Sequence, residues 1–137
     1  MAAEDRRRRA LLILLDTDVL IEIRRGDPRI TTWFTELSEP TKLAGMAPLE
    51  FLIGSRNAVE LRQSERFLNR FEVLWQISGD NALARELVLR HKLSTGLSFA
   101  DYLIAAQSLN LGATLASFNL RHFRAIPDLE VRAPYVR

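Results

Sequence analysis

The sequence predicts an α/β fold, an α/β/α sandwich with a central parallel sheet of four or five strands. Residues 11–15 are a short, continuously apolar run, as found in strands that are buried on both faces of a parallel sheet. Such runs alternate along the chain with longer stretches in which apolar residues recur at helical spacing. With 137 residues, 47% of them hydrophobic, the chain is long enough for one domain with a substantial core.

The first half of the chain places short helices after each strand. A helix over 19–25 ends at a Gly-Asp-Pro sequence, and a second helix over 30–37 is followed by a proline. The second strand is predicted over 42–47. Pro48 then suits the first position of a helix over 49–57, where its missing N–H group costs no hydrogen bond.

The second half repeats this alternation. An apolar stripe at helical spacing predicts a helix over 59–70, and a third strand follows at 72–75. An amphipathic helix ends near Ser94, and the next runs from Ser98 to about Asn110, with a glycine as its stop. The remaining strands are predicted at 113–116 and, at an edge of the sheet, 129–132.

Residues 1–10 form a basic tail rich in arginine, which we expect to be flexible, and residues 11–137 form the single domain. The apolar run after the tail is far shorter than the roughly 20 residues of a membrane span, and Asp16 interrupts it. We therefore expect no membrane association.

Composition narrows the chemistry. The absence of cysteine excludes disulfides, thiolate zinc sites and cysteine nucleophiles, and it suits the cytoplasm, which is the predicted location. Because His91 and His122 are the only histidines, a metal would be held mainly by oxygen, which indicates magnesium or manganese. The net charge is +2 and nearly all cations are arginines, whose planar guanidinium groups suit phosphate and hence a nucleic-acid partner.

Oxygen-bearing side chains follow the predicted strands. Asp16 ends the first strand, Glu50 is the third residue of the helix after the second strand, and Asp101 lies in the first turn of a later helix. Asn119 comes just after the fourth strand, close to Ser117. Because ligands of open α/β sheets bind beyond the carboxyl ends of the strands, these side chains are predicted to converge at one edge.

Each acid also has a purely structural interpretation. Asp101 completes a Ser-Phe-Ala-Asp capping box, and Glu50 suits the positive end of its helix. Thr17 or Asp18 is a suitable N-cap. Asp16, in contrast, abuts a buried strand and is not needed to cap a helix. The convergence of all the acids therefore favours a functional site.

Gathered carboxylates repel one another, which raises their pKa values, and a divalent cation removes this penalty. We expect Asp16 and Asp101 to bind the metal directly, while Glu50 binds a second ion or orients the attacking water. A metal-activated water would attack phosphorus while an ion stabilises the leaving oxygen. The pattern predicts metal-dependent hydrolysis of phosphodiester bonds.

Four segments resemble the motifs of the PIN-domain family, specifically the VapC-type toxins of bacterial and archaeal toxin–antitoxin pairs. The first reads Leu-Leu-Asp-Thr-Asp-Val-Leu-Ile, and the third reads Gly-Leu-Ser-Phe-Ala-Asp-Tyr-Leu-Ile-Ala-Ala. The four segments occur in the family's order, and the resemblance spans nearly the whole chain after the arginine tail. The segments are 14–21, 49–57, 96–106 and 112–123.

The resemblance implies an α/β/α fold, Mg²⁺- or Mn²⁺-dependent cleavage of RNA, a homodimer, and a cognate antitoxin that inserts a segment near the acidic pocket. Asp16, Glu50 and Asp101 match the family's three most regular acids. The fourth acidic position, commonly aspartate, is Asn119 here, which offers an amide oxygen but no charge. Asn119 is included among the predicted catalytic residues, but without a fourth carboxylate the sequence does not decide between one metal ion and two, and a lower activity is compatible with it.

Ser117, Arg121 and His122 are predicted substrate contacts, because they adjoin Asn119 and the cations could meet RNA phosphates at the rim of the pocket. The alternative is that the two cations lie on an exposed loop without a function.

Two other functions stay open. In a haloacid-dehalogenase-like phosphatase, Asp16 would attack phosphorus and Asp18 would act as acid and base, with Asp80 in a later metal motif. The second acid expected after Asp80 is missing, however, and the chain is short for that fold. The other alternative is a catalytically weak binding module that keeps the PIN scaffold, which the neutral Asn119 favours.

Overall fold

The computed structural model describes residues 12–137, which form a five-stranded, all-parallel sheet with the strand order β3-β2-β1-β4-β5. The predicted α/β fold is confirmed, with five strands. The strands are short: β1 Ile13–Leu15, β2 Thr41–Ala44, β3 Val73–Leu74, β4 Thr114–Ala116 and β5 Val131–Arg132. The predicted basic tail and the first residue of the predicted strand at 11–15 lie outside the described residues.

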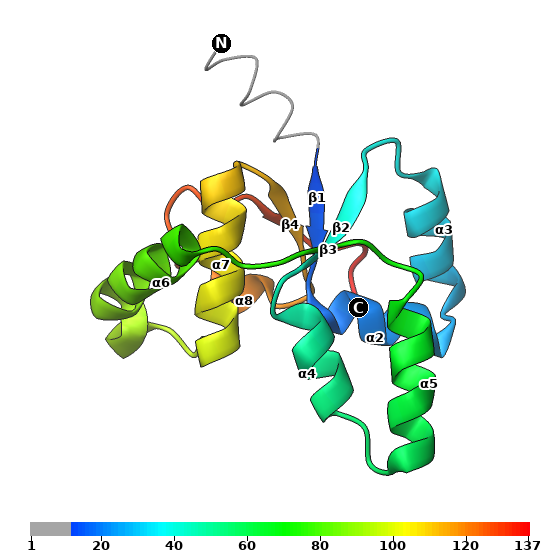
Figure 1. The fold of residues 1–137 in the computed structure, drawn as a ribbon. Coiled ribbons are helices and arrows are strands. Elements are labelled where there is room, and N and C mark those ends of the chain that lie inside the picture. Colours follow the sequence, from blue (N-terminus) through cyan, green and yellow to red (C-terminus); the bar gives the residue numbers. More distant parts are fainter. Residues whose placement is uncertain (1–11) are drawn as a thin grey trace.

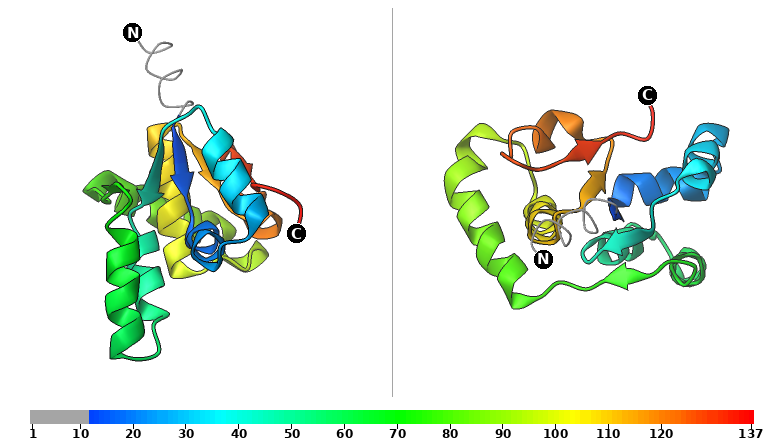
Figure 2. Two further views of the ribbon diagram at one scale, coloured as in Figure 1. Left: turned by 90° about the vertical axis from the view of Figure 1, so that its right-hand side faces the viewer. Right: turned by 90° about the horizontal axis from the view of Figure 1, so that it is seen from above.

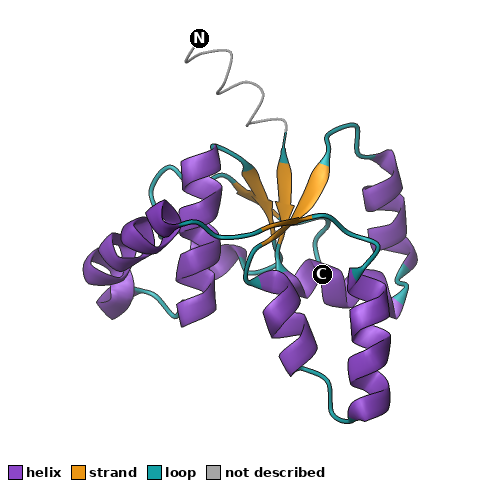
Figure 3. Ribbon diagram, in the orientation of Figure 1, coloured by secondary structure: helices purple, strands orange, loops and turns teal. Residues whose placement is uncertain are grey.

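Helices surround this sheet, as Figure 1 and Figure 3 show. They are α2 Thr17–Arg25, α3 Pro28–Glu36, α4 Ala47–Ile53, α5 Ala58–Leu68, α6 Ser78–His91, α7 Phe99–Leu111 and α8 Leu120–Phe123, with a 3₁₀ turn at Lys92–Ser94. Helices α6 and α7 lie on one side of the sheet and α2 and α3 on the other (Figure 2), which confirms the sandwich. Helices α4 and α5 project beyond the carboxyl ends of the strands.

The core lies between these layers. Leu14, Leu15, Leu43 and Leu115, from the three central strands, have no exposed surface, which explains why these strands read as continuous apolar runs. No helix within residues 12–137 combines the length and the apolar character that crossing a membrane requires.

Two glycines end helices where the sequence predicts. Gly26 closes α2 at φ 76° and Gly112 closes α7 at φ 64°, and both N–H groups bond to carbonyls of the preceding turn. These left-handed conformations strain residues with a side chain, so glycine makes a sharp stop at each position.

The largest boundary differences lie around α4. The second strand ends at Ala44 instead of residue 47, because the chain turns at Gly45 and the helix already begins at Ala47. The helix ends at Ile53 instead of residue 57, because Asn57 caps α5 by accepting the Glu60 N–H group at 2.9 Å. The prediction also missed α8, which is only one turn long.

A buried glutamine of α7 fixes the turn that leads into α4. Gln107 is 2% exposed; its Oε1 accepts the Gly45 N–H group at 2.9 Å, and its Nε2 donates to the carbonyl of Leu74. A Cβ atom on Gly45 would lie 2.9 Å from that carbonyl oxygen, so the backbones approach too closely for a side chain. Gln107 therefore holds the ends of β2 and β3 together.

We expect Gln107→Leu to lower the free energy of unfolding by about 2–3 kcal/mol, because it leaves the buried Gly45 N–H group without its partner and removes the donor to the partly buried Leu74 carbonyl. Urea titration followed by circular dichroism measures this loss. The matched control is Gln63→Leu on the exposed face of α5, with an expected change below about 0.5 kcal/mol. Equal losses in the two variants would show that the Gln107 bonds do not stabilise the turn.

Candidate active site

A pocket of about 500 Å³ lies at the carboxyl edge of the sheet. Asp16 reaches it from the end of β1, Glu50 from α4, Asp101 from α7, and Asn119 from the start of α8. The structure thus brings together the four predicted catalytic residues. Among the described residues 12–137, the pocket is lined by Asp16, Thr17, Asp18, Ile21, Glu50, Asp101, Phe118, Asn119 and Arg137.

Asp16 is the most deeply placed acid of the pocket, with 5% of its surface exposed. One carboxylate oxygen accepts the Thr17 N–H group at 2.8 Å, and the other accepts the Ser117 hydroxyl at 2.7 Å. Burial, followed by the nearby charge of Asp18, raises the pKa of Asp16 from 3.8 to about 7. The two hydrogen bonds oppose this shift without cancelling it.

Asp16 is also the N-cap of α2, so the prediction that it caps nothing is wrong. Helix α2 begins two residues before the predicted start because Asp16, and neither Thr17 nor Asp18, takes the extended conformation of an N-cap. The cap fixes where the carboxylate stands relative to the helix.

Asp18 lines the same pocket, although it was not among the predicted site residues. Its Oδ2 accepts the Phe118 N–H group at 3.0 Å and lies 3.3 Å from the Ser117 hydroxyl. Its Oδ1 is buried and has no hydrogen-bond partner in the part of the chain that the structure describes. Burial raises the pKa of Asp18. The sequence signal for Asp18 was the Asp-Thr-Asp pattern, in which two acids flank Thr17 directly after a buried strand.

Glu50 is linked to the first helix through a hydroxyl group. Thr17 Oγ1 donates to Glu50 Oε1 at 2.7 Å. Burial first, and the charges of Asp101 and Asp18 second, raise the pKa of Glu50. Because α4 begins at Ala47, Glu50 is the fourth residue of the helix and not the third, yet it still lies in the first turn.

The predicted capping box at α7 is present. Asp101 accepts the Ser98 N–H group at 3.0 Å, and the Asp101 N–H group donates to the Ser98 hydroxyl at 3.2 Å. The same aspartate lines the pocket, so the structural and the functional interpretations of this residue are both compatible with its position.

Ser117 does not face the pocket as a substrate contact would. Its side chain has no exposed surface; its hydroxyl donates to Asp16 and accepts the Asn119 N–H group at 3.0 Å. The geometry instead makes Ser117 a support for the acids. Asn119 begins α8 without capping it through its side chain, and this side chain lines the pocket.

The structure does not bring the two predicted phosphate contacts to the pocket. Arg121 is exposed on α8, and neither Arg121 nor His122 belongs to the lining. His122 packs against the loop before α7 so closely that a Cβ atom on Gly96 would lie 2.9 Å from its Nε2.

The donor chemistry of the pocket fits a hard divalent cation. All four acids offer carboxylate oxygens, and the buried Oδ1 of Asp18 has no partner among residues 12–137. Burial, and after it the charge of neighbouring carboxylates, raises the pKa values of Asp16 and Glu50, and a cation would favour their ionised forms. Within residues 12–137, however, no three acidic or histidine side chains form a ready-made metal cluster. Protein groups donate hydrogen bonds to both oxygens of Asp16 and to one oxygen each of Asp18, Glu50 and Asp101.

The acid that a haloacid-dehalogenase-like phosphatase would need lies elsewhere. Asp80 is 3% exposed, and it accepts the Ile77 N–H group at 3.0 Å and the Asn110 side-chain amide at 2.9 Å. It caps α6 and does not line the pocket.

Comparison with known proteins agrees with this geometry. The PIN domain family matches residues 13–129. The chain is 31% identical over 123 residues to ribonuclease VapC19 of Mycobacterium tuberculosis. This alignment covers 85% of this chain and 96% of that protein. The chain is also 30% identical to ribonuclease VapC10 of the same species, over 87% of this chain and 91% of that protein.

Solved structures show the same fold. VapBC2 from Rickettsia felis, bound to a promoter DNA fragment, superposes with a TM-score of 0.78 and 19% identity, covering 89% of this chain and 98% of that chain. FitAcB from Neisseria gonorrhoeae superposes with a TM-score of 0.71 and 25% identity, covering 89% and 97%. The chain therefore belongs to the PIN-domain family, among its VapC-type members, and not to the haloacid-dehalogenase-like phosphatases.

Proposed function

We propose that the protein is a Mg²⁺- or Mn²⁺-dependent endoribonuclease and the toxin of a type II toxin–antitoxin pair. The observation that carries this proposal is the pocket in which Asp16, Glu50 and Asp101 converge from three separate elements. The names of the relatives at about 30% identity support ribonuclease activity.

We assign the ion to Asp16 and Asp101, with Glu50 placed to bind a second ion or to orient the attacking water. A bound ion would supply positive charge to a phosphate oxygen and would lower the pKa of a water molecule. Glu50 is suited to accept the proton of that water, because its pKa is raised and the Thr17 hydroxyl holds its carboxylate in place. Ser117 keeps Asp16 oriented, and Asn119 adds an uncharged amide oxygen.

We further propose RNA, a cognate antitoxin and a second copy of the chain as partners, and the cytoplasm as the location. Neighbouring structures of VapBC and FitAB complexes support an antitoxin partner. The second candidate function is a binding module with weak or no catalysis. Two observations favour it: the neutral Asn119 in the pocket, and the absence of a ready-made metal cluster within residues 12–137.

Loss of the Asp16 carboxylate should separate these two functions. We expect the wild type to bind Mn²⁺ in calorimetry and Asp16→Asn to bind it more than about tenfold more weakly, because a direct ligand loses its charge. Sequencing of RNA ends after induced expression should show a dominant cleavage site only with the wild type. Glu86→Gln, on the exposed face of α6, is the control and should behave like the wild type. Equal Mn²⁺ binding and intact RNA with all three proteins would favour the binding module.

The stability of the ion-free protein should depend on the ionisation of Asp16. Since its pKa is about 7 in the folded state and 3.8 as the reference value, the folded protein keeps a proton that the unfolded chain releases. The stability from this group is therefore lost as the pH rises from about 4 through about 7. In EDTA, Asp16→Asn should raise the melting temperature at pH 8 by about 2–5 °C and leave it nearly unchanged at pH 4. A lower melting temperature for the variant at pH 8 would show that the buried charge of Asp16 does not destabilise the fold.

Replacing the neutral residue of the pocket tests its role in metal binding. We expect Asn119→Asp to increase the affinity for Mn²⁺ by roughly tenfold, because a fifth carboxylate strengthens the attraction for a cation. Without ions the variant should melt at a lower temperature, since the added charge increases repulsion. Unchanged Mn²⁺ affinity would show that the side chain at this position does not approach the ion.

A further inference from the structure

The acidic pocket has a single cation among its lining residues within 12–137, and this is Arg137. Its guanidinium carbon lies 4.2 Å from the centre of the Phe118 ring, and its Nη1 donates to Glu22 Oε1 at 3.1 Å. Its charge is close enough to lower the pKa of Asp18. The guanidinium group of Arg137 thus contacts the Phe118 ring, which lines the pocket, and the buried Glu22 of α2.

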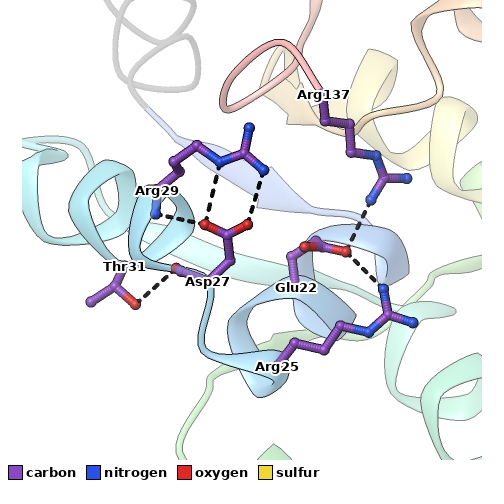
Figure 4. A network of polar contacts seen from close by, with 6 residues as sticks. All are labelled: Glu22, Arg25, Asp27, Arg29, Thr31 and Arg137. Atoms are coloured by element: carbon purple, nitrogen blue, oxygen red, sulfur yellow. Dashed lines mark hydrogen bonds and ion pairs between the residues drawn. The ribbon is translucent and has the colours of Figure 1, made fainter.

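The carboxylate of Glu22 does not fully neutralise the positive charge of Arg137. The same Oε1 atom also accepts Nη1 of Arg25 at 3.1 Å, so one carboxylate is shared by two guanidinium groups. Figure 4 shows Arg25 and Arg137 approaching Glu22 from opposite sides. Together the three side chains keep one net positive charge. The side chain of Arg137 is 45% exposed, and only one of its five N–H donors, the one that bonds to Glu22, has a partner within residues 12–137.

A phosphodiester that enters this pocket meets four carboxylates, so its approach is opposed unless positive charge lies beside it. Arginine is suited to this task because its planar fork matches two phosphate oxygens. Stacking on Phe118 and the bond to Glu22 restrict the side chain before RNA arrives, which reduces the entropy lost on binding.

We propose that Arg137 binds a non-bridging phosphate oxygen of the RNA strand in the acidic pocket and so is a substrate-binding residue. This inference rests on the proposed ribonuclease function. It replaces Arg121 and His122, which the sequence suggested as phosphate contacts, with a residue that lines the pocket.

Arg25 offers a matched control, because it makes the same 3.1 Å bond to the same Glu22 oxygen but does not line the acidic pocket. The probe is a labelled RNA that carries the cleavage site mapped with the wild-type protein. Single-turnover cleavage is measured against protein concentration and salt for the wild type, Arg137→Gln, Arg137→Lys and Arg25→Gln.

For Arg137→Gln we expect the protein concentration at half-maximal rate to rise about tenfold, while the maximal rate changes much less. The slope of log affinity against log salt should fall by about 0.7, the value for one lost phosphate contact on a single strand. Arg137→Lys should keep the salt slope, because the charge is preserved. Arg25→Gln should change both quantities much less than Arg137→Gln does, because Arg25 does not line the pocket.

Equal effects of Arg137→Gln and Arg25→Gln would overturn the inference, because they would trace the loss to the Glu22 contact that both arginines share. An unchanged salt slope in Arg137→Gln would overturn it as well. If the wild type cleaves RNA and Arg137→Gln matches it, only the inference fails. If the wild type cleaves no RNA, the proposed function fails and the inference fails with it.

Discussion

The site depends on one carboxylate that is buried where β1 ends. Asp16 is bonded through its side chain to the start of α2 and to Ser117, the residue after β4, and its N–H group donates to the carbonyl of Ala116 at 3.0 Å. The ends of the two central strands and the first helix therefore meet at a single acid. Burying a charge is unfavourable unless it is paired, and the raised pKa of Asp16 shows that these bonds compensate the charge only in part.

The other acids are also held by hydrogen bonds from protein groups at the pocket, one of them local and two of them between distant segments of the chain. Asp101 caps α7, Glu50 accepts the Thr17 hydroxyl, and Asp18 accepts a backbone N–H group of the segment after β4. Capping and function are therefore not alternatives here. A cap sets the direction of a carboxylate at the first turn of a helix, and the parallel sheet places these first turns along one edge.

The sequence was sufficient to predict the parallel sheet, the elements that carry Asp16, Glu50 and Asp101, and the position of Asn119 just after the fourth strand, but not the short helix α8 that Asn119 begins. These predictions follow from local patterns, since apolar runs mark buried strands and ligand-bearing residues follow strand ends. Contacts between distant parts of the chain were not predictable in the same way. Ser117 reaches Asp16 across 101 residues, and Arg137 reaches Glu22 across 115. No periodicity encodes such pairs, so the buried support and the cation of the pocket became visible only in the structure.

Asn119 and Arg137 both make the pocket less negative than it would be with aspartate at position 119 and a neutral side chain at position 137. With every acid ionised, four carboxylates and one guanidinium leave three net negative charges. Aspartate in place of Asn119 and a neutral side chain in place of Arg137 would leave five. The difference of two charges equals one divalent ion. Under the proposed function, a single ion would leave this pocket with the same charge that two ions would leave in the more acidic arrangement, so a neutral fourth position is compatible with binding a phosphodiester.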